Sequence, residues 1–524
     1  MNRAASVFAW LETHPRWSAL GLGALAALGF RPLALWPLTL LAMAGLLALT
    51  MRTERRRDAA LLGWLFGLAH FTLGNNWIAT AFTYQAEMPA LLGWAAVPLL
   101  SLYLAVYPAF AALAARMIAG NRLGWPAVLA FAGCWIVSEW LRGWVFTGYP
   151  WNPLGAVLLG GFHSQGVAAL LPWLGTYALS GLAVLLPGAG LLLALGRRMV
   201  PLGALVALLV AAMHSPAGKG REGHLPVTLV QPDFRQEELN DPRFFEAQFA
   251  TIARLSLPLE PAGHRLVVWP ESGLPDYLQD DYPQRYYDQM TAGGDPAFAR
   301  ARVGRVIGTG GLLLTGTVDL EIAGGKAVGA YNAVTALDHA GGIRGSYAKA
   351  HLVPYGEYLA LRWLLEPLGA SRLVAGAFDF IPGPGPRTLD LGQWGKVGPQ
   401  ICYEIIFSGH VVDRAHRPDY IYNPSNDGWF GSWGPPQHLA QARMRAIEEG
   451  LPVLRATTTG ISAIIDARGI VRHHAPMREA RRIDATVPPA AAPTPFSRLG
   501  NLLPLAWAAL LISTALVATL RARR

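Results

Sequence analysis

Apolar residues are unevenly distributed along this chain of 524 residues. Residues 1–213 are almost continuously apolar, residues 220–486 mix apolar and polar positions, and residues 502–520 are apolar again. An α-helix needs about 20 predominantly apolar residues to cross a bilayer. The pattern therefore predicts membrane helices at both ends of the chain. The expected spans are 15–31, 33–50, 59–78, 90–115, 124–141, 166–196, 199–213 and 502–520.

Arginine marks every second loop between these spans. Arginines occur within 52–57, 116–122 and 197–198 and in the C-terminal tail, whereas residues 79–89 contain none. The positive-inside rule places such arginine-rich loops in the cytoplasm. Both termini are then expected in the cytoplasm, with the large polar segment on the other side, which is the periplasm of a bacterium with two membranes. Because further spans follow the first one at once, we expect an uncleaved anchor and not a signal peptide.

These patterns predict four parts of the chain. Residues 1–216 are expected to hold the N-terminal transmembrane helices, and residues 220–486 a periplasmic domain. The Pro- and Ala-rich residues 487–500 are expected to form a linker. Residues 501–524 should provide the last transmembrane helix and a cytoplasmic tail.

Short β-type runs alternate with helical patterns inside the polar segment. This alternation is typical of an α/β domain. The expected strands are 225–234, 264–269, 310–320, 330–338, 342–350, 395–405 and 419–426, followed by a hairpin over 452–459 and 461–469. The expected helices are 242–258, 295–308, 409–415 and 435–450.

Composition adds a constraint on partners. Only 15% of the residues are charged, against about 25% in soluble domains. The net charge of +9 could suggest nucleic acid, but much of the excess is arginine beside the spans and no nucleic-acid motif occurs. Attraction to anionic lipid head groups is the better explanation.

The two cysteines fall in different surroundings. Cys134 lies in an apolar span and Cys402 in the polar domain, so a disulfide, which needs the two within a few ångströms, is not expected. We interpret Cys134 as a small packing residue. An unpaired cysteine in an oxidising compartment is a candidate nucleophile, and this applies to Cys402.

Three unlike ionisable residues follow expected strands. Glu271, Lys349 and Cys402 each come at or just after a strand end, where ligands collect in α/β sheets. Taken singly, each is more often a solvated or packing residue. Lysine is also rare in this arginine-rich chain, and its amine, unlike guanidinium, has a tunable pKa. Together the three residues predict a catalytic site.

The same residues carry a family resemblance. The motifs 269-WPES-272, 347-YAKAHLVPYGEY-358 and 400-QICYEI-405 resemble the Glu, Lys and Cys motifs of the nitrilase superfamily. With the spans, 148-GYPW-151 and 423-NPSNDGWFG-431, the chain resembles the apolipoprotein N-acyltransferase family, the membrane-embedded branch of that superfamily. This resemblance implies a polytopic bundle of about eight transmembrane helices that carries a nitrilase-like α-β-β-α sandwich.

The resemblance also implies residue roles. Glu271 would be the general base and acid, Lys349 the oxyanion stabiliser and Cys402 the nucleophile, whose thiolate we expect Lys349 to favour. The backbone N–H of Tyr403 is a second candidate oxyanion donor. The supporting residues implied are Glu357, Tyr403, Glu404, Asn332 and Trp429. One departure is that residues 235–241 contain no tryptophan, so lipid gating by that family residue does not carry over.

The implied activity is phospholipid-dependent N-acylation in the bacterial inner membrane. A thioester on Cys402 would take an acyl group from a phospholipid and pass it to the α-amine of a diacylglyceryl apolipoprotein. The family suggests sn-1 chains of phosphatidylethanolamine or phosphatidylglycerol and a monomer. We expect no cofactor and no metal, and we expect His351 to support the site or to pack beside it in preference to binding a metal. Residues 359–380 are expected to form an amphipathic arm on the bilayer, with a core helix as the alternative.

Two other functions remain open from the sequence. A membrane-anchored amidase that uses water as acceptor would share the same three residues, but it leaves the many spans and residues 359–380 unexplained. A membrane scaffold or transporter could use polar span residues such as Asn75, Asn76 and Glu139. The intact set of Glu271, Lys349 and Cys402 argues against this second alternative.

Overall fold

A computed structural model describes residues 13–84, 91–218, 220–259, 263–368 and 379–523. The chain divides into two compact units. The helical unit comprises Met1–Ala79, Leu91–Ala217 and Thr494–Arg524, and the α/β unit comprises Thr80–Ala90 and Gly218–Pro493. The boundary near residue 493 falls within the expected linker, of which Pro495–Leu499 forms a short helix, α16.

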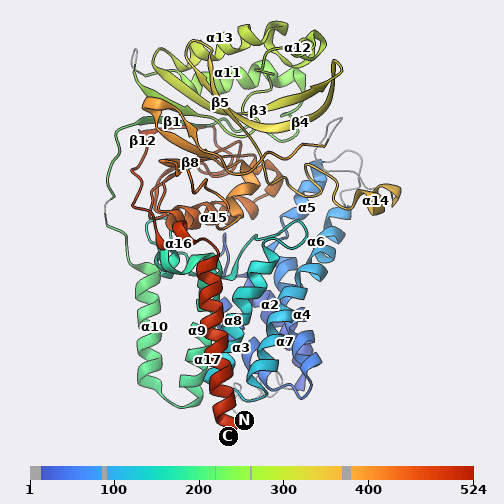
Figure 1. Ribbon diagram of the computed structural model, residues 1–524, viewed down its shortest axis with the longest axis vertical. Coiled ribbons are helices and arrows are strands. Elements are labelled where there is room, and N and C mark those ends of the chain that lie inside the picture. The colour runs from blue at the N-terminus through green and yellow to red at the C-terminus, as the bar shows by residue number, and fades with distance from the viewer. Residues whose placement is uncertain (1–12, 85–90, 219, 260–262, 369–378, 524) are drawn as a thin grey trace. The chain divides into compact units, whose positions relative to one another are not determined.

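Helices occupy all eight apolar segments of the helical unit (Figure 1). Three segments are long and apolar enough to cross a membrane, namely Leu91–Ala119, Val167–Leu195 and Leu502–Arg523. Two further apolar helices are shorter. Among the described residues, three segments therefore qualify as candidate spans, fewer than the eight expected. The helices are α2 Pro15–Ala27, α3 Trp36–Met51, α4 Arg56–Gly74, α5 Ile78–Ala81, α6 Leu91–Leu104, α7 Val106–Ala119, α8 Trp125–Arg142, α9 Leu171–Leu195, α10 Met199–His214 and α17 Leu502–Arg523.

Small residues let these helices approach closely, as in membrane bundles. A Cβ atom on Gly23 of α2 would lie 2.1 Å from the carbonyl oxygen of Phe66 on α4. Cys134 is buried, as expected of a packing residue. Glu139 is also buried, and its Oε1 accepts a hydrogen bond of 2.7 Å from the N–H of Leu154. It therefore ties α8 to the 3-10 helix Leu154–Leu158 of the same unit.

The α/β unit contains two six-stranded sheets. The first has the order β12-β1-β2-β3-β4-β5 and the second β11-β10-β9-β8-β7-β6. The strands of the first sheet are β1 Pro226–Gln231, β2 Arg265–Val268, β3 Gly311–Ala323, β4 Lys326–Asp338, β5 Ile343–Ala348 and β12 Arg481–Thr486. Those of the second are β6 Leu389–Asp390, β7 Lys396–Pro399, β8 Tyr420–Ser425, β9 Val453–Thr457, β10 Ala463–Ile465 and β11 Val471–His474.

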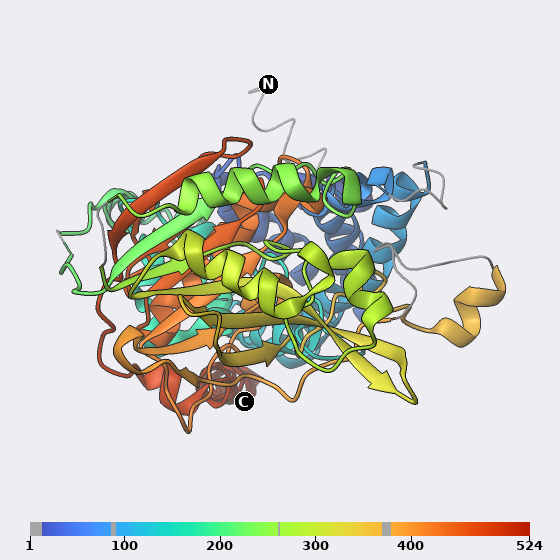
Figure 2. The ribbon, with the colours of Figure 1, turned by 90° about the horizontal axis from the view of Figure 1, so that it is seen from above.

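Helices cover the outer face of each sheet, which gives the α-β-β-α order expected from the resemblance. Helices α11 (Phe245–Ser256) and α13 (Pro296–Ile307) lie side by side over the first sheet, and α12 (Gln284–Met290) lies near them (Figures 1 and 2). Helix α15 (Gly434–Glu449) packs against the second sheet. The Tyr422 hydroxyl of β8 reaches the carbonyl oxygens of Trp269 and Leu314, so a buried polar contact joins the sheets.

Most of the expected elements are confirmed, including the antiparallel pair β9–β10. The helix expected over 409–415 is wrong, because this segment consists of turns and bends. The Asp413 side chain accepts hydrogen bonds from the N–H groups of Ala415 and His416. Such local side-chain bonds compete with helix formation. The strand expected over 395–405 ends at Pro399 and is followed by a 3-10 helix, Cys402–Ile406.

Candidate active site

Cys402 begins the 3-10 helix that follows β7. Its φ of +47° lies in the left-handed region, which is uncommon for a residue with a side chain. Non-glycine residues persist there only when the surroundings hold them, and they cluster at functional sites. Cys402 is only 5% exposed. The chain therefore presents this thiol at a sharp, buried turn.

Glu271 lies in the turn after β2, and its position depends on a glycine in the neighbouring strand. A Cβ atom on Gly316 of β3 would lie 2.7 Å from the Cα of Glu271. Any side chain there would displace the turn. The Glu271 carboxylate then accepts hydrogen bonds from Asn332 Nδ2 through Oε1, at 2.7 Å, and from the N–H of Asn426 through Oε2, at 2.8 Å.

Lys349 lies between two carboxylates. Its Nζ donates to Oε1 of Glu357 at 2.9 Å and lies 3.6 Å from Oε1 of Glu271. Asn332 Nδ2 bridges the same two oxygens, at 2.7 Å and 2.8 Å. Glu357 is held in turn by the N–H of Val353. The structure thus brings together four residues named from the sequence in one buried cluster.

This cluster determines the charge of the lysine and the state of the thiol. Burial favours a neutral amine, but Glu357 and Glu271 outweigh it and raise the pKa of Lys349 above its ordinary value. Burial and then the Glu271 charge raise the pKa of Cys402 well above its ordinary value, and Lys349 only partly opposes them. Lys349 thus favours the thiolate, as expected, but burial and Glu271 outweigh it, and the net direction of the pKa favours the thiol.

Glu404 fastens the nucleophile turn to the lysine segment. Its Oε1 accepts hydrogen bonds from the Tyr347 hydroxyl at 2.7 Å and from the N–H groups of Ala350 at 2.8 Å and His351 at 3.2 Å. Its Oε2 accepts from the N–H of Ile401 at 2.7 Å. Burial raises the pKa of Glu404 to about 7. This carboxyl group therefore fixes Cys402 and Lys349 relative to each other through their neighbours.

The other expected residues have packing roles in the described structure. Tyr403 is buried and its ring lies edge-on to Phe407. The imidazole of His351 stacks on the same ring, with centroids 4.1 Å apart. Trp429, in the turn after β8, packs edge-to-face against Tyr84. Among the described residues, no group of three or more His, Cys, Asp or Glu side chains could hold a metal ion.

Known protein families match both parts of the chain. The model of the apolipoprotein N-acyltransferase N-terminal domain matches residues 22–189, and the carbon-nitrogen hydrolase model matches residues 229–492. The apolipoprotein N-acyltransferase of Rhodopseudomonas palustris is 33% identical over 92% of this chain and 91% of its own length. That of Bradyrhizobium diazoefficiens is 34% identical over 96% and 94%.

The chain belongs to the apolipoprotein N-acyltransferase family.

Among solved structures, an amidase from Nesterenkonia sp. AN1 with a covalent adduct at its active-site cysteine is 18% identical. It matches 52% of this chain and 94% of its own, with a TM-score of 0.34.

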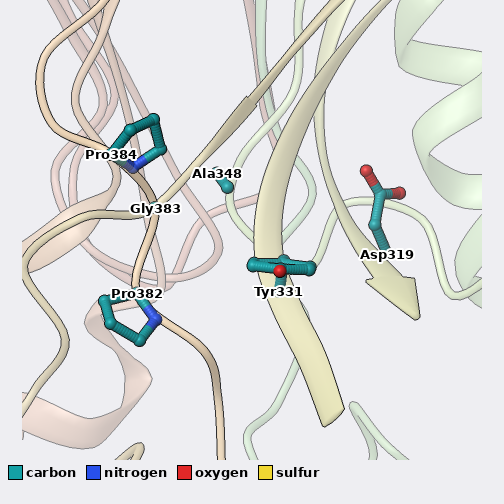
Figure 3. A pocket seen from close by; sticks show the side chains of 6 residues that line it. All are labelled: Asp319, Tyr331, Ala348, Pro382, Gly383 and Pro384. Carbon is teal, nitrogen blue, oxygen red and sulfur yellow. The ribbon is translucent and has the colours of Figure 1, made fainter. Parts of the chain in front are cut away.

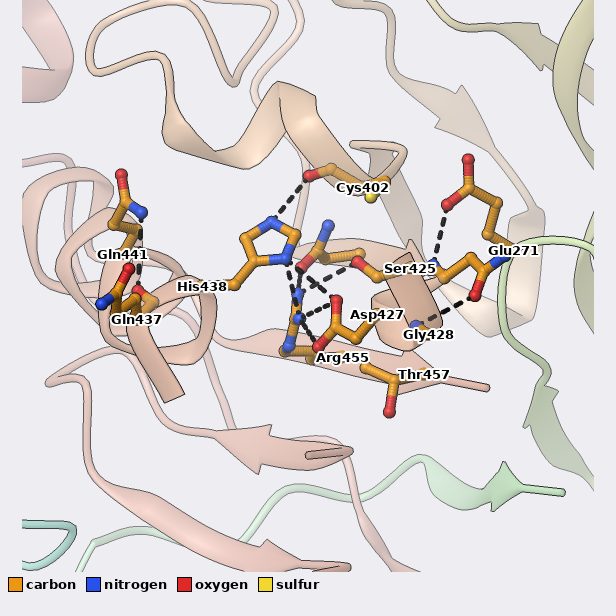
Figure 4. A network of polar contacts seen from close by, with 12 residues as sticks. Glu271, Cys402, Ser425, Asp427, Gly428, Gln437, His438, Gln441, Arg455 and Thr457 are labelled. Atoms are coloured by element: carbon orange, nitrogen blue, oxygen red, sulfur yellow. Dashed lines mark hydrogen bonds and ion pairs between the residues drawn. The ribbon is translucent and has the colours of Figure 1, made fainter. Parts of the chain in front are cut away.

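Within this apolipoprotein N-acyltransferase family member, sequence reasoning missed a second buried cluster (Figure 4). Asp427 accepts from Arg455 Nη2 through both oxygens, at 2.9 Å and 2.7 Å. His438 of α15 lies 3.1 Å from Asp427 and 3.0 Å from the carbonyl oxygen of Cys402. The signal available was the polar run 423-NPSND-427, which ends a strand on the same sheet edge as Cys402.

The segment 235–241, which lacks the family tryptophan, is tied to this part of the site. Gln236 Oε1 accepts a hydrogen bond of 2.9 Å from Asn426 Nδ2. Phe234 and Leu239, on either side of it, are buried in the core of the first sheet. In this chain the segment is therefore linked to Asn426, whose N–H holds Glu271.

A cavity of about 440 Å³ lies elsewhere, beside β3, β4 and the end of β5 (Figure 3). Asp319 and Tyr331 face each other across β3 and β4 and line it together with Ala348, Pro382 and Gly383. Successive side chains of a strand point to opposite faces, so Tyr331 faces away from the side that Asn332 presents to Glu271. The cavity is therefore separate from the catalytic cluster.

Within the described part of residues 359–380, the one α-helix is short and carries exposed apolar side chains. Trp363 is 76% exposed and Leu364 is 44% exposed, on the short helix α14 (Arg362–Leu365). Residues 369–378 lie outside the described residues. An exposed tryptophan beside an exposed leucine is typical of a surface that contacts a membrane or a partner.

Proposed function

We propose that this chain transfers a fatty acyl group from a phospholipid to the α-amine of the N-terminal diacylglyceryl-cysteine of lipoproteins, the last step of lipoprotein maturation. The observation that carries the proposal is the buried Cys402 thiol adjoining Lys349, which is held between Glu271 and Glu357. The relatives that share most of the chain's length are named apolipoprotein N-acyltransferases, which supports the proposal.

The first half-reaction forms a thioester. Glu271 takes the proton of the Cys402 thiol as Sγ attacks the ester carbonyl, and the oxyanion forms beside the ammonium of Lys349 and the N–H of Tyr403. The carbonyl then re-forms as the ester C–O bond breaks. Glu271 returns its proton to the departing lysophospholipid oxygen, which leaves the acyl group on Cys402.

The second half-reaction forms an amide. The α-amine has a pKa of about 7.7–8.0, so a useful fraction is neutral near pH 7. It attacks the thioester through a second oxyanion at the same place, and Glu271 carries its proton to the departing sulfur. Both halves balance without ATP, a redox partner or a metal.

The proposed setting is the bacterial inner membrane. We place eight membrane helices at the eight apolar segments, with the α/β domain of residues 220–486 in the periplasm and both termini in the cytoplasm. The arginine pattern supports this orientation. We further propose that the enzyme works as a monomer and that Trp363 and Leu364 contact the bilayer, from which the phospholipid donor comes.

Intact mass spectrometry of the purified enzyme incubated with phosphatidylethanolamine tests this function. We expect the mass of one acyl group to be added, removed by neutral hydroxylamine and absent in Cys402→Ala. Cys134→Ala is the matched control and should acylate normally. A diacylglyceryl lipopeptide should then discharge the thioester and become triacylated.

The main alternative is an amidase that uses water as acceptor, and the same experiment separates the two. Rapid loss of the acyl group in buffer, with no transfer to the lipopeptide, would favour the hydrolase. An acyl group that never appears on Cys402 would rule out both mechanisms.

A further inference from the structure

His438 makes a contact that ordinary core packing does not require. It is fully buried on α15, and its Nε2 lies 3.0 Å from the carbonyl oxygen of Cys402. A carbonyl oxygen can only accept a hydrogen bond. Nε2 must therefore carry the proton and donate it to the backbone of the nucleophile.

The other ring nitrogen is fixed by the buried ion pair. Nδ1 lies 3.0 Å from Arg455 Nη2, which can only donate, and 3.1 Å from Asp427 Oδ1. Burial and the Arg455 charge lower the pKa of His438 below its ordinary value, so the ring is neutral. In a neutral ring with a proton on Nε2, Nδ1 is the acceptor for Arg455. The Cys402 carbonyl thereby sets the tautomer, and the contacts of Nδ1 with the ion pair fix the orientation of the imidazole.

Peptide geometry transmits this constraint to the next residue. The peptide bond between Cys402 and Tyr403 is planar, and in a trans peptide the C=O and the N–H point in opposite directions. Figure 4 shows the Cys402 carbonyl oxygen directed at His438, with the sulfur on the side nearer Glu271. Because His438 holds the C=O, the N–H of Tyr403 is turned away from α15.

We propose that His438 is a positioning residue that aims the Tyr403 N–H at the oxyanion of the acyl-transfer reaction. This inference rests on the proposed function. His438 does not touch substrate; it fixes the strained turn at Cys402 so that the donor is in place before the oxyanion forms. Preorganised donors of this kind need no rearrangement during the reaction. Both half-reactions pass through an oxyanion at this place, so both depend on His438.

The test compares three substitutions at one position. Gln places an amide N–H₂ near the position of Nε2, Asn places one near Nδ1, and Leu removes both. We expect His438→Leu and His438→Asn to slow acyl-enzyme formation from phosphatidylethanolamine by about ten- to hundredfold, less than the loss of a whole oxyanion donor. His438→Gln should restore the rate to within about threefold of the wild type, since the donor to the Cys402 carbonyl returns.

Alkylation of Cys402 by iodoacetamide provides the second measurement. It is a displacement at saturated carbon and forms no oxyanion, so the three variants should alkylate at the wild-type rate. A parallel loss of alkylation and acylation would overturn the inference, because His438 would then position the thiol and not the Tyr403 N–H. Wild-type acylation in His438→Leu or His438→Asn would overturn it as well.

The controls separate this inference from the proposed function. A wild-type enzyme that alkylates but never acylates contradicts the proposed function itself. If His438→Leu does not fold, as shown by thermal unfolding, the Gln and Asn variants decide, because both keep a polar side chain at the buried position. Equal acylation rates in these two variants contradict the inference.

Discussion

Two buried clusters of charged side chains lie beside Cys402, and they differ in whether their positive and negative charges are equal in number. In the first, one lysine lies between two carboxylates, Glu271 and Glu357. In the second, Asp427 and Arg455 pair one to one, with a neutral His438 beside them. The first cluster has one carboxylate more than it has cations, so it can accept a proton. In the second cluster the arginine neutralises the carboxylate, and no proton is exchanged at neutral pH. In the proposed mechanism, similar residue types therefore serve proton transfer in one cluster and orientation in the other.

The largest effect is expected from Glu271→Gln. The amide keeps the acceptor for Asn332 but cannot take the thiol proton, so acyl-enzyme formation should fall by about 10²- to 10⁴-fold, the range for loss of a general base. Intact mass measured over time gives the rate.

Glu246→Gln is the matched control, since Glu246 pairs with Arg302 at the surface of the α/β unit. The control should acylate normally. If Glu271→Gln forms the acyl-enzyme at a rate within tenfold of the wild-type rate, the first cluster does not act in proton transfer and the two clusters do not differ in this respect.

The next largest effect is expected from breaking the Asp427–Arg455 ion pair. Arg455→Met leaves Asp427 charged and buried without its partner, which should cost about 3–5 kcal/mol of unfolding free energy. Urea denaturation followed by tryptophan fluorescence measures this loss. Arg302→Met, which breaks the exposed pair with Glu246, should cost less than about 1 kcal/mol. Equal losses in the two variants would show that burial adds nothing to the Asp427–Arg455 pair.

The sign of the pH dependence of this pair follows from Asp427. Burial opposes its ionisation, but the partners of the carboxylate, led by the Arg455 charge, lower the pKa of Asp427 below its ordinary value of 3.8. A lowered carboxyl pKa gives stability above that value and loses it as the pH falls further. The difference between wild type and Arg455→Met should therefore persist at pH 7 and shrink as the pH falls and Asp427 becomes protonated, first in the variant, where burial raises its pKa, and then in the wild type.

The state of the thiol gives a third prediction. Because burial and Glu271 raise the pKa of Cys402, the thiolate fraction is smaller than in an ordinary cysteine at the same pH. Alkylation by iodoacetamide should therefore rise about tenfold per pH unit between pH 6 and 9 without a plateau, since only the thiolate reacts. Cys402→Ala gives the background from Cys134. A plateau below pH 8 would instead indicate a resting thiolate stabilised by Lys349.

The smallest effect concerns lipid capture. The double substitution Trp363→Ser and Leu364→Ser removes exposed apolar area and should raise the phospholipid concentration needed for half-maximal acylation by about three- to tenfold. The rate at saturating phospholipid should not change. Val328→Ser, at another exposed apolar position on β4, is the control. Unchanged lipid dependence in the double variant would remove this segment from lipid binding.

The first cluster was predictable from sequence because its members follow strand ends and carry uncommon residue types for this chain. The second was not, since Asp427, His438 and Arg455 come from a turn, a helix and a strand that meet only through the fold of the second sheet. Arg455 sits in a strand and is fully buried, although arginine is rarely buried unless paired. The helix expected over 409–415 failed because Asp413 bonds locally to the backbone. Apolar runs gave the helix positions, but helix length limits which of them qualify as spans.

The four hydrogen bonds of Glu404 have a consequence for the motion of the site. One carboxyl group holds the backbone before Cys402 and the backbone after Lys349, so these segments cannot fluctuate independently. Ordering two loose segments around a substrate would cost about 1–2 kcal/mol of conformational entropy for each residue fixed. In this site the two segments are already ordered once the domain has folded, so substrate binding does not have to order them. The binding energy of the lipid tails is then free to hold the ester against the sulfur.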